Sequence, residues 1–130
     1  MNEKERPWIT ERAYISPWTY EANEGISLPE QVMIYDVTLR DGEQYPGLVL
    51  RKEDKIRLAE ALNDLGISRL EAGMPAVSQD DFEAVREIAK RVKTNVVAFC
   101  RGMRRDVDLA VDAGAWGVIV ELPSNETLIE

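Results

Sequence analysis

Three side chains that could carry out chemistry lie close together in the segment 36–47, which reads DVTLRDGEQYPG. Asp41 offers a carboxylate oxygen, the hard donor that divalent cations such as Mg²⁺ and Mn²⁺ prefer. Arg40 offers a guanidinium fork that can hold a carboxylate or polarise a carbonyl oxygen. Gln44 can both donate and accept hydrogen bonds. The segment therefore places a metal ligand beside an anion-binding arginine.

An expected buried strand positions these side chains. Residues 32–35 form a short apolar run of strand-favouring side chains, and the chain turns polar immediately after it. In α/β folds, ligands bind at the rim formed by the carboxyl ends of the strands. We therefore expect the polar groups to lie at such a rim. The alternative is an ordinary charged turn, in which Arg40 pairs with Asp36 or Glu43.

Helix and strand patterns alternate in the rest of the chain. The spacing of apolar residues predicts helices over residues 52–65, 78–92 and 104–114. Apolar runs predict strands over residues 67–72, 95–100 and 116–121, and a further helix is expected to begin at 126–130. Gly66 is placed to end the first helix, and Ser78 with Asp81 forms a capping box for the second. This alternation predicts parallel strands joined by helical connections.

Glu71 comes at the end of the second expected strand, as the charges of the first segment follow the first. Spacing alone favours a solvated salt bridge from Glu71 to Arg69 or Arg40 over a catalytic role. A weak internal repeat of helix, glycine, strand and glutamate places Glu121 at the equivalent point of the fourth strand.

Two residues that end the third strand have simple interpretations. Cys100 is expected to be a small buried apolar residue rather than a nucleophile, because the chain has no histidine to activate it. Arg101 either adds positive charge at the rim or only solvates the loop.

Composition excludes several classes of protein. A net charge of -8 argues against a nucleic-acid-binding surface, which needs a basic patch. One cysteine allows no internal disulfide, and no apolar stretch approaches the roughly 20 residues of a membrane span. The N-terminus lacks the apolar core of a signal peptide, so we expect a cytoplasmic protein that contacts no membrane. Residues 1–31, rich in proline and aromatic residues, are expected to form an irregular arm packed on the main domain or on a partner subunit.

The motif at 36–47 resembles the signature at the first strand of a family of metal-dependent (β/α)8 barrels. That family includes 2-isopropylmalate synthase, homocitrate synthase, citramalate synthase and 3-hydroxy-3-methylglutaryl-CoA (HMG-CoA) lyase. The segment EAGMPA at 71–76 is similar to the synthases in particular. The resemblance implies an α/β fold, the N-terminal half of a TIM (β/α)8 barrel with about four parallel strands. The expected domains are the arm at 1–31 and a partial, truncated catalytic domain at 32–130.

The resemblance also implies roles for individual residues. Arg40 would contact a 2-oxo acid and take part in catalysis, and Asp41 would ligate a divalent metal, namely Mg, Mn or Zn. Gln44 would bind substrate in the same site, and Glu71 would line it as a further catalytic residue. The implied partners are a small 2-oxo acid and acetyl-CoA as co-substrate, with a homodimer expected for the full-length protein.

The function that the resemblance implies is an acyltransferase condensing acetyl-CoA with a 2-oxo acid in a Claisen reaction. One alternative is a lyase or aldolase that cleaves a carbon–carbon bond on the same scaffold, and another is a non-catalytic half-barrel that binds a partner. The family completes its metal site with a His-X-His pair from a later strand, whereas this chain contains no histidine. We therefore expect the chain to be a fragment of a longer gene product and to be inactive alone.

Overall fold

A computed structural model describes residue 16, residues 18–27 and residues 29–124. The chain divides into two units, Met1–Val32 and Met33–Glu130, each described here by itself. The first unit contains α1 (Trp18–Ala22), a helix of five residues where the sequence predicted irregular structure. Local hydrogen bonds account for α1, because Ser16 O accepts from Thr19 N at 3.0 Å and Asn23 Nδ2 donates to Thr19 O at 2.6 Å. The helix expected at 126–130 lies outside the described residues.

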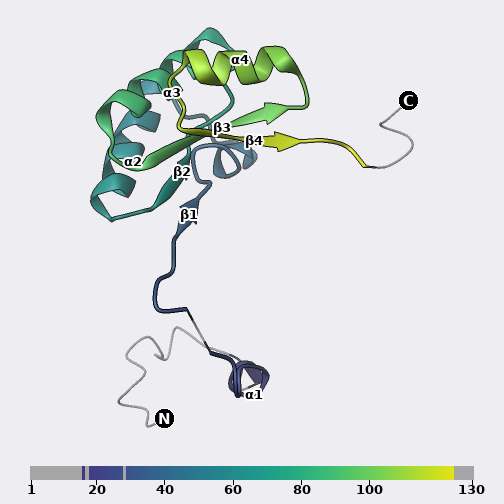
Figure 1. Ribbon diagram of the computed structural model, residues 1–130. Helices are drawn as coiled ribbons and strands as arrows, with labels where there is room; N and C mark the ends of the chain where they lie inside the picture. Colours follow the sequence, from purple (N-terminus) through teal and green to yellow (C-terminus); the bar gives the residue numbers. More distant parts are fainter. Residues whose placement is uncertain (1–15, 17, 28, 125–130) are drawn as a thin grey trace. The chain divides into compact units, whose positions relative to one another are not determined.

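The second unit is built on a four-stranded parallel sheet whose strands follow chain order. The strands are β1 (Tyr35–Asp36), β2 (Arg69–Glu71), β3 (Asn95–Arg101) and β4 (Gly117–Glu121) (Figure 1). In the register of the sheet, Tyr35 lies opposite Arg69, and Glu71 lies opposite Val97. The predicted parallel arrangement is therefore confirmed, and it places the carboxyl ends of β1 and β2 side by side.

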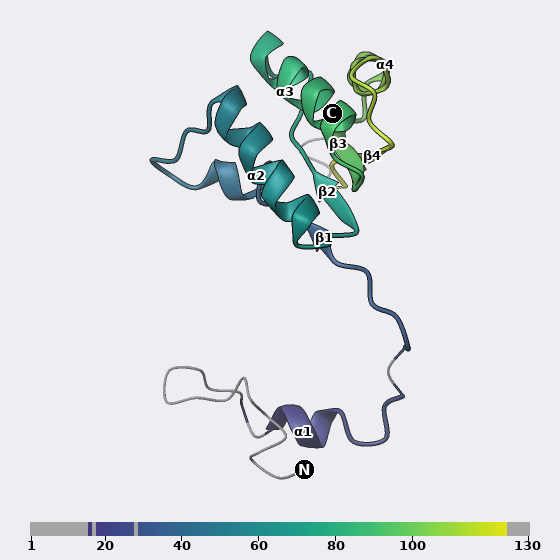
Figure 2. The same ribbon diagram turned by 90° about the vertical axis from the view of Figure 1, so that its left-hand side faces the viewer.

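Three helices pack on one side of this sheet, as Figures 1 and 2 show together. They are α2 (Lys52–Asp64), α3 (Gln79–Arg91) and α4 (Arg104–Asp112), and a short 3₁₀ helix, η2 (Gly42–Gln44), follows β1. The Ser78 hydroxyl accepts the Asp81 N–H at 3.1 Å, which confirms the N-cap bond of the predicted capping box, while the Asp81 carboxylate accepts the Ser78 hydroxyl and not its backbone N–H. The core between helices and sheet includes Leu70, Val85, Ile88, Val96, Ala98 and Cys100. Among the described residues, no helix has the length and apolar character of a membrane span.

The first strand is shorter and more exposed than the sequence predicted. Residues 32–35 were expected to form a buried strand, but Val32, Met33 and Ile34 are 76%, 67% and 56% exposed and precede β1. Within the described part of the chain, β1 is an edge strand paired only with β2, so few neighbours cover its start. The prediction that residues 32–35 form a buried strand was therefore wrong. An apolar run in the sequence does not show whether other elements of the fold cover it.

Two glycines depend on backbone conformations that other residues rarely adopt. Gly66 ends α2 at φ 86°, as predicted, and Gly73 follows β2 at φ 137°. A Cβ at Gly73 would lie 3.6 Å from Val85 Cγ2, which is an ordinary contact, so the strain lies in the backbone.

We expect Gly73→Ala to lower the free energy of unfolding by about 1–3 kcal/mol through this backbone strain. The measurement is urea unfolding followed by circular dichroism. Gly117→Ala is the matched control, because φ at Gly117 is not positive and a Cβ there meets nothing within 4 Å. Equal stability of the two variants would contradict the prediction.

Candidate active site

The turn after β1 fixes the backbone that carries Arg40 and Asp41. Their N–H groups donate to Val37 O at 3.1 and 2.8 Å. The Asp36 carboxylate accepts both the backbone N–H and the hydroxyl of Thr38, at 3.0 and 3.1 Å. These bonds close a tight turn directly after the strand. They also occupy Asp36, which pairs with Thr38 instead of with Arg40.

The guanidinium of Arg40 is held on three sides. Its Nε donates to Glu71 Oε1 at 2.5 Å, and its Nη1 donates to Asp41 Oδ1 at 3.0 Å. Its Cζ lies 4.7 Å from the centre of the Phe99 ring, a distance typical of cation–π stacking. Burial is the largest single influence and opposes the charge, but the hydrogen bond to Glu71 together with the negative charges of Glu71 and Asp41 outweighs it and raises the pKa of Arg40 above its usual value. The group is therefore a fixed cation at the end of β1.

Glu71 is the anion that orients this cation. Its side chain is buried, and both carboxylate oxygens have donors, because Tyr35 Oη donates to Oε2 at 2.7 Å while Arg40 occupies Oε1. Partial burial and the hydrogen bond to Glu71 raise the pKa of Tyr35, so its hydroxyl stays protonated at neutral pH. A carboxylate with both oxygens engaged is suited to orient Arg40 rather than to remove a proton.

The structure corrects the simpler interpretation of Glu71. The partner is Arg40, but the pair is not solvated, because Glu71 is only 1% exposed. Arg69, the other suggested partner, instead lies over the Trp116 ring at 5.4 Å. The suggested pairing of Arg40 with Glu43 was also wrong, since Glu43 pairs with a lysine described below.

Asp41 and Gln44 lie on the same segment in more open positions. The Asp41 side chain is 60% exposed, and Gln44 is exposed on η2. An exposed carboxylate of this kind suits a hard divalent cation. In residues 29–124 no three His, Cys, Asp or Glu side chains cluster to hold a metal, so Asp41 remains a single candidate ligand. Of the four predicted residues, the structure joins Arg40, Asp41 and Glu71 by direct contacts.

Two residues of the cluster, Tyr35 and Phe99, were missed from the sequence. Phe99 is two residues beyond Val97, which lies opposite Glu71 in the sheet, so strand alternation places Phe99 and Glu71 on the same face. That inference requires the register of β2 against β3. The sequence pattern alone predicts the two strands but not their register.

Arg101 does not act as a free cation at the rim. Its Nε and Nη2 donate to Asp106 Oδ2 and Oδ1 at 2.7 and 3.0 Å, and its backbone N–H donates to Oδ2 at 3.1 Å. These bonds lower the pKa of the buried Asp106 carboxyl below its usual range, and the hydrogen bond from the Arg101 side chain makes the largest contribution. Next to it, Cys100 is buried and burial raises the pKa of its thiol, as expected for a core residue.

The Asp106 pair predicts a pH-dependent stability. A lowered pKa in the folded state contributes stability above the unfolded carboxyl pKa of about 3.9, and this contribution is lost as the pH falls through the folded value. We therefore expect Asp106→Asn to destabilise the protein more at pH 7 than at pH 3, measured by urea unfolding. Asp108→Asn, at an exposed position of the same helix, should change little at either pH. An equal loss for Asp106→Asn at both pH values would contradict the assignment.

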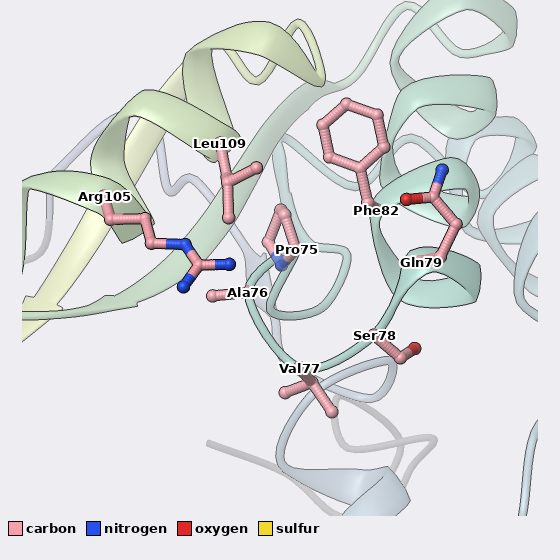
Figure 3. Close-up of a pocket in the computed structure, with 8 residues that line it drawn as sticks. All are labelled: Pro75, Ala76, Val77, Ser78, Gln79, Phe82, Arg105 and Leu109. Carbon is pink, nitrogen blue, oxygen red and sulfur yellow. The ribbon is translucent and has the colours of Figure 1, made fainter.

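A pocket of about 310 Å³ opens beside the loop that follows β2 (Figure 3). Its lining residues are Pro75, Ala76, Val77, Ser78, Gln79, Phe82, Arg105 and Leu109. In Figure 3 the Arg105 guanidinium extends toward Ala76 and Pro75, while the Ser78 hydroxyl is engaged with Asp81 at 2.6 Å. The pocket lining offers no carboxylate, and it includes none of the predicted site residues.

The fold and the site together define a class of protein. Parallel strands in chain order with helices on one side are typical of (β/α) barrels, whose active sites lie at the carboxyl ends of the strands, and the cluster of Arg40 and Glu71 lies at the ends of β1 and β2. The chain belongs to the HMGL-like family, whose model matches residues 31–130. The family resemblance noted in the sequence is thereby confirmed.

Curated relatives carry the names of condensing synthases. The chain is 41% identical over 112 residues to homocitrate synthase AksA of Methanopyrus kandleri, covering 85% of this chain and 28% of that protein. It is 44% identical over 106 residues to a probable 2-isopropylmalate synthase of Ignicoccus hospitalis, covering 81% of this chain and 27% of that protein. It is 45% identical over 97 residues to a putative (R)-citramalate synthase CimA of Archaeoglobus fulgidus, covering 74% of this chain and 20% of that protein. The chain thus spans less than a third of the length of these relatives.

A solved structure supports the fold. The HMG-CoA lyase of Bacillus subtilis superimposes with a TM-score of 0.62 at 25% sequence identity, over 78% of this chain and 36% of that one. The predicted fold class, an α/β arrangement with parallel strands that matches part of a TIM-barrel enzyme, is therefore confirmed.

Proposed function

We propose that this chain forms the first strands of an acyltransferase that condenses acetyl-CoA with a 2-oxo acid. The observation that carries the proposal is the cluster in which Glu71 and Asp41 hold the Arg40 guanidinium, at 2.5 and 3.0 Å. Relatives named homocitrate, 2-isopropylmalate and citramalate synthase support the same assignment. The motif resembles the one in which this arginine contacts the 2-oxo acid.

Arg40 would bind and polarise the substrate oxygens. Its Nε and Nη1 are engaged with Glu71 and Asp41, whereas Nη2 makes no hydrogen bond within residues 29–124. Nη2 could therefore donate to a carboxylate or to the oxygen on which negative charge develops during carbon–carbon bond formation. A donor held in place before the reaction stabilises such charge without reorganisation.

The remaining residues would position this donor and a metal. Glu71 and Phe99 hold the guanidinium plane, and Tyr35 keeps the Glu71 carboxylate in one orientation. Asp41 would be a ligand for a divalent cation such as Mg²⁺, Mn²⁺ or Zn²⁺, which when bound supplies Lewis-acid polarisation of substrate oxygens. Gln44, exposed on the same segment, would hydrogen-bond the substrate.

Carbon–carbon cleavage is the second candidate. The superposition on HMG-CoA lyase favours it, and a lyase also needs an arginine beside a charged substrate oxygen. Release of CoA thiol from acetyl-CoA with one of several 2-oxo acids would identify the synthase. Cleavage confined to a preformed hydroxyacyl-CoA would identify the lyase, and no turnover by any product of the gene would favour a non-catalytic binding module.

The proposal is tested by comparing this chain with the longest product of its gene. We expect this chain to bind Mn²⁺ weakly in calorimetric titration and to release no CoA thiol, because Asp41 alone cannot fix the position of a cation. A longer product should bind Mn²⁺ more tightly and turn over. Tight Mn²⁺ binding together with turnover by this chain alone would overturn the view that it holds only part of the site.

A further inference from the structure

A buried lysine lies behind the candidate site. Lys55 of α2 is 3% exposed, although lysine side chains usually extend their charge into water. Its Nζ lies 2.6 Å from Glu43 Oε2 and 2.6 Å from Asp81 Oδ1. A buried ammonium group is costly unless it is paired in this way. Lys55 is therefore a paired structural cation and not a free nucleophile.

The first of its partners belongs to the turn that carries the site. Glu43 lies in η2, two residues after Asp41, and η2 contains no buried residue. Backbone bonds such as Gln44 N to Asp41 O at 3.1 Å hold the turn only to itself. Apolar packing anchors the start of the turn through Leu39, which is fully buried in the core, but it does not reach η2, which the ion pair with Lys55 ties to the helices.

The second partner belongs to the helix that follows β2. Asp81 Oδ2 accepts the Ser78 hydroxyl at 2.6 Å, and Ser78 Oγ accepts the Asp81 N–H at 3.1 Å. These bonds lock the carboxylate at the start of α3. Lys55 thereby joins the turn after β1, which carries Arg40, to the segment that follows Glu71.

We propose that Lys55 is a positioning residue for the candidate site, holding the η2 turn so that Arg40 and Asp41 keep their place beside Glu71. Burial is the largest single influence and opposes the charge of Lys55, but the hydrogen bonds to Asp81 and Glu43 together with the charges of these carboxylates outweigh it and raise the pKa of Lys55, so its ammonium group stays charged at neutral pH. A displacement of about 1 Å in a reacting group can cost about 10²-fold in rate. The inference rests on the proposed function, because positioning matters only if Arg40 and Asp41 meet the substrate.

The first test measures how firmly the η2 turn is held in this chain, and it does not require enzymatic activity. Lys55→Met keeps most of the length and removes the charge, and NMR follows amide exchange at Gln44 and Tyr45 and the Nε–H signal of Arg40. We expect about tenfold faster exchange and a shifted Arg40 signal. Lys55→Arg should restore both in part. Unchanged exchange and an unchanged Arg40 signal in folded Lys55→Met protein would overturn the inference.

Lys52→Met is the matched control on the same helix. Lys52 pairs with Glu83 at 3.0 Å and is 31% exposed, and within residues 29–124 it makes no hydrogen bond or ion pair with η2. The same substitution there removes a charge and an ion pair without releasing the turn. We expect normal exchange at Gln44 and Tyr45 in this variant, and equal effects of the two lysine variants would count against the inference.

A second variant covers the case in which Lys55→Met does not fold. Glu43→Gln removes the negative charge of the η2 arm of the network and leaves the contact between Lys55 and Asp81, which holds the helices together. We expect it to unfold cooperatively, with the same faster exchange at Gln44. A folded Glu43→Gln protein with normal exchange and a normal Arg40 signal would also overturn the inference.

Kinetics separate this inference from the proposed function. In a gene product that turns over, Glu43→Gln and Lys55→Met should lower kcat about tenfold with little change in KM for acetyl-CoA, and Lys55→Arg should recover part of it. Altered exchange in a protein without turnover would support the positioning of the turn and count against the proposed function. Normal exchange with normal kcat in the variants of an active protein would overturn the positioning role alone.

Discussion

Lysine in place of Arg40 is expected to lower kcat/KM for condensation by about 10²–10³-fold, comparable to the loss of one oxyanion-hole donor. Lysine keeps the charge but has a single nitrogen where arginine has three. The observed group simultaneously donates to Glu71 and Asp41 and stacks on Phe99 at 4.7 Å. One ammonium cannot satisfy both carboxylates, stack on the ring and still present a donor to the substrate.

The measurement is CoA-thiol release by the product of the gene that shows turnover, with wild type and variant compared at equal Mn²⁺ concentration. Arg104→Lys is the control, because this residue is 95% exposed on α4 and only its Nε lies near a carboxylate, 3.9 Å from Asp108. The control should retain wild-type kcat/KM. A less than threefold effect of Arg40→Lys would show that the fork is not used in the transition state.

Removing the Glu71 carboxylate is expected to lower the free energy of unfolding by about 3 kcal/mol, near the lower end of the range for breaking a buried ion pair. Glu71→Ala would leave Arg40 Nε and the Tyr35 hydroxyl without an acceptor and would open a cavity at the end of β2. The lower end applies because Arg40 is 22% exposed, so water can reach part of the guanidinium. Urea unfolding of this chain at pH 7 measures the loss.

Glu121→Ala is the matched control for Glu71→Ala. Both glutamates end a strand of the same sheet, but Glu121 is exposed at the end of β4. We expect its replacement to change stability by less than about 0.5 kcal/mol, as for most surface positions. If the two variants lose equal stability, burial and pairing do not account for the role assigned to Glu71.

The sequence by itself determined the features that depend on neighbours within a few residues. Ser78 caps α3 through Asp81, three residues away, and Gly66 ends α2 with a positive φ. The alternation of helices and strands follows from apolar periodicity, which is also a local property. The motif around Arg40 and Asp41 identified the family because its residue types occur together in a short segment.

Only the tertiary structure decided which charged residue pairs with which. From the sequence, Asp36, Glu43 and Glu71 were all candidate partners of Arg40. Asp36 turns back on Thr38, Glu43 reaches Lys55, and Glu71 meets Arg40. The physical reason is that ion pairing depends on strand register and on burial, which are set by residues far apart in the chain.

The same reason explains the contacts that sequence patterns missed. Phe99 stacks on Arg40 because β3 pairs with β2 in one particular register, and Tyr35 reaches Glu71 because β1 lies beside β2. The apolar run before Tyr35 was predicted to be buried, yet it is exposed because β1 is an edge strand among the described strands. Local composition determines which residues are apolar, and only the packing of distant elements determines which of them are covered.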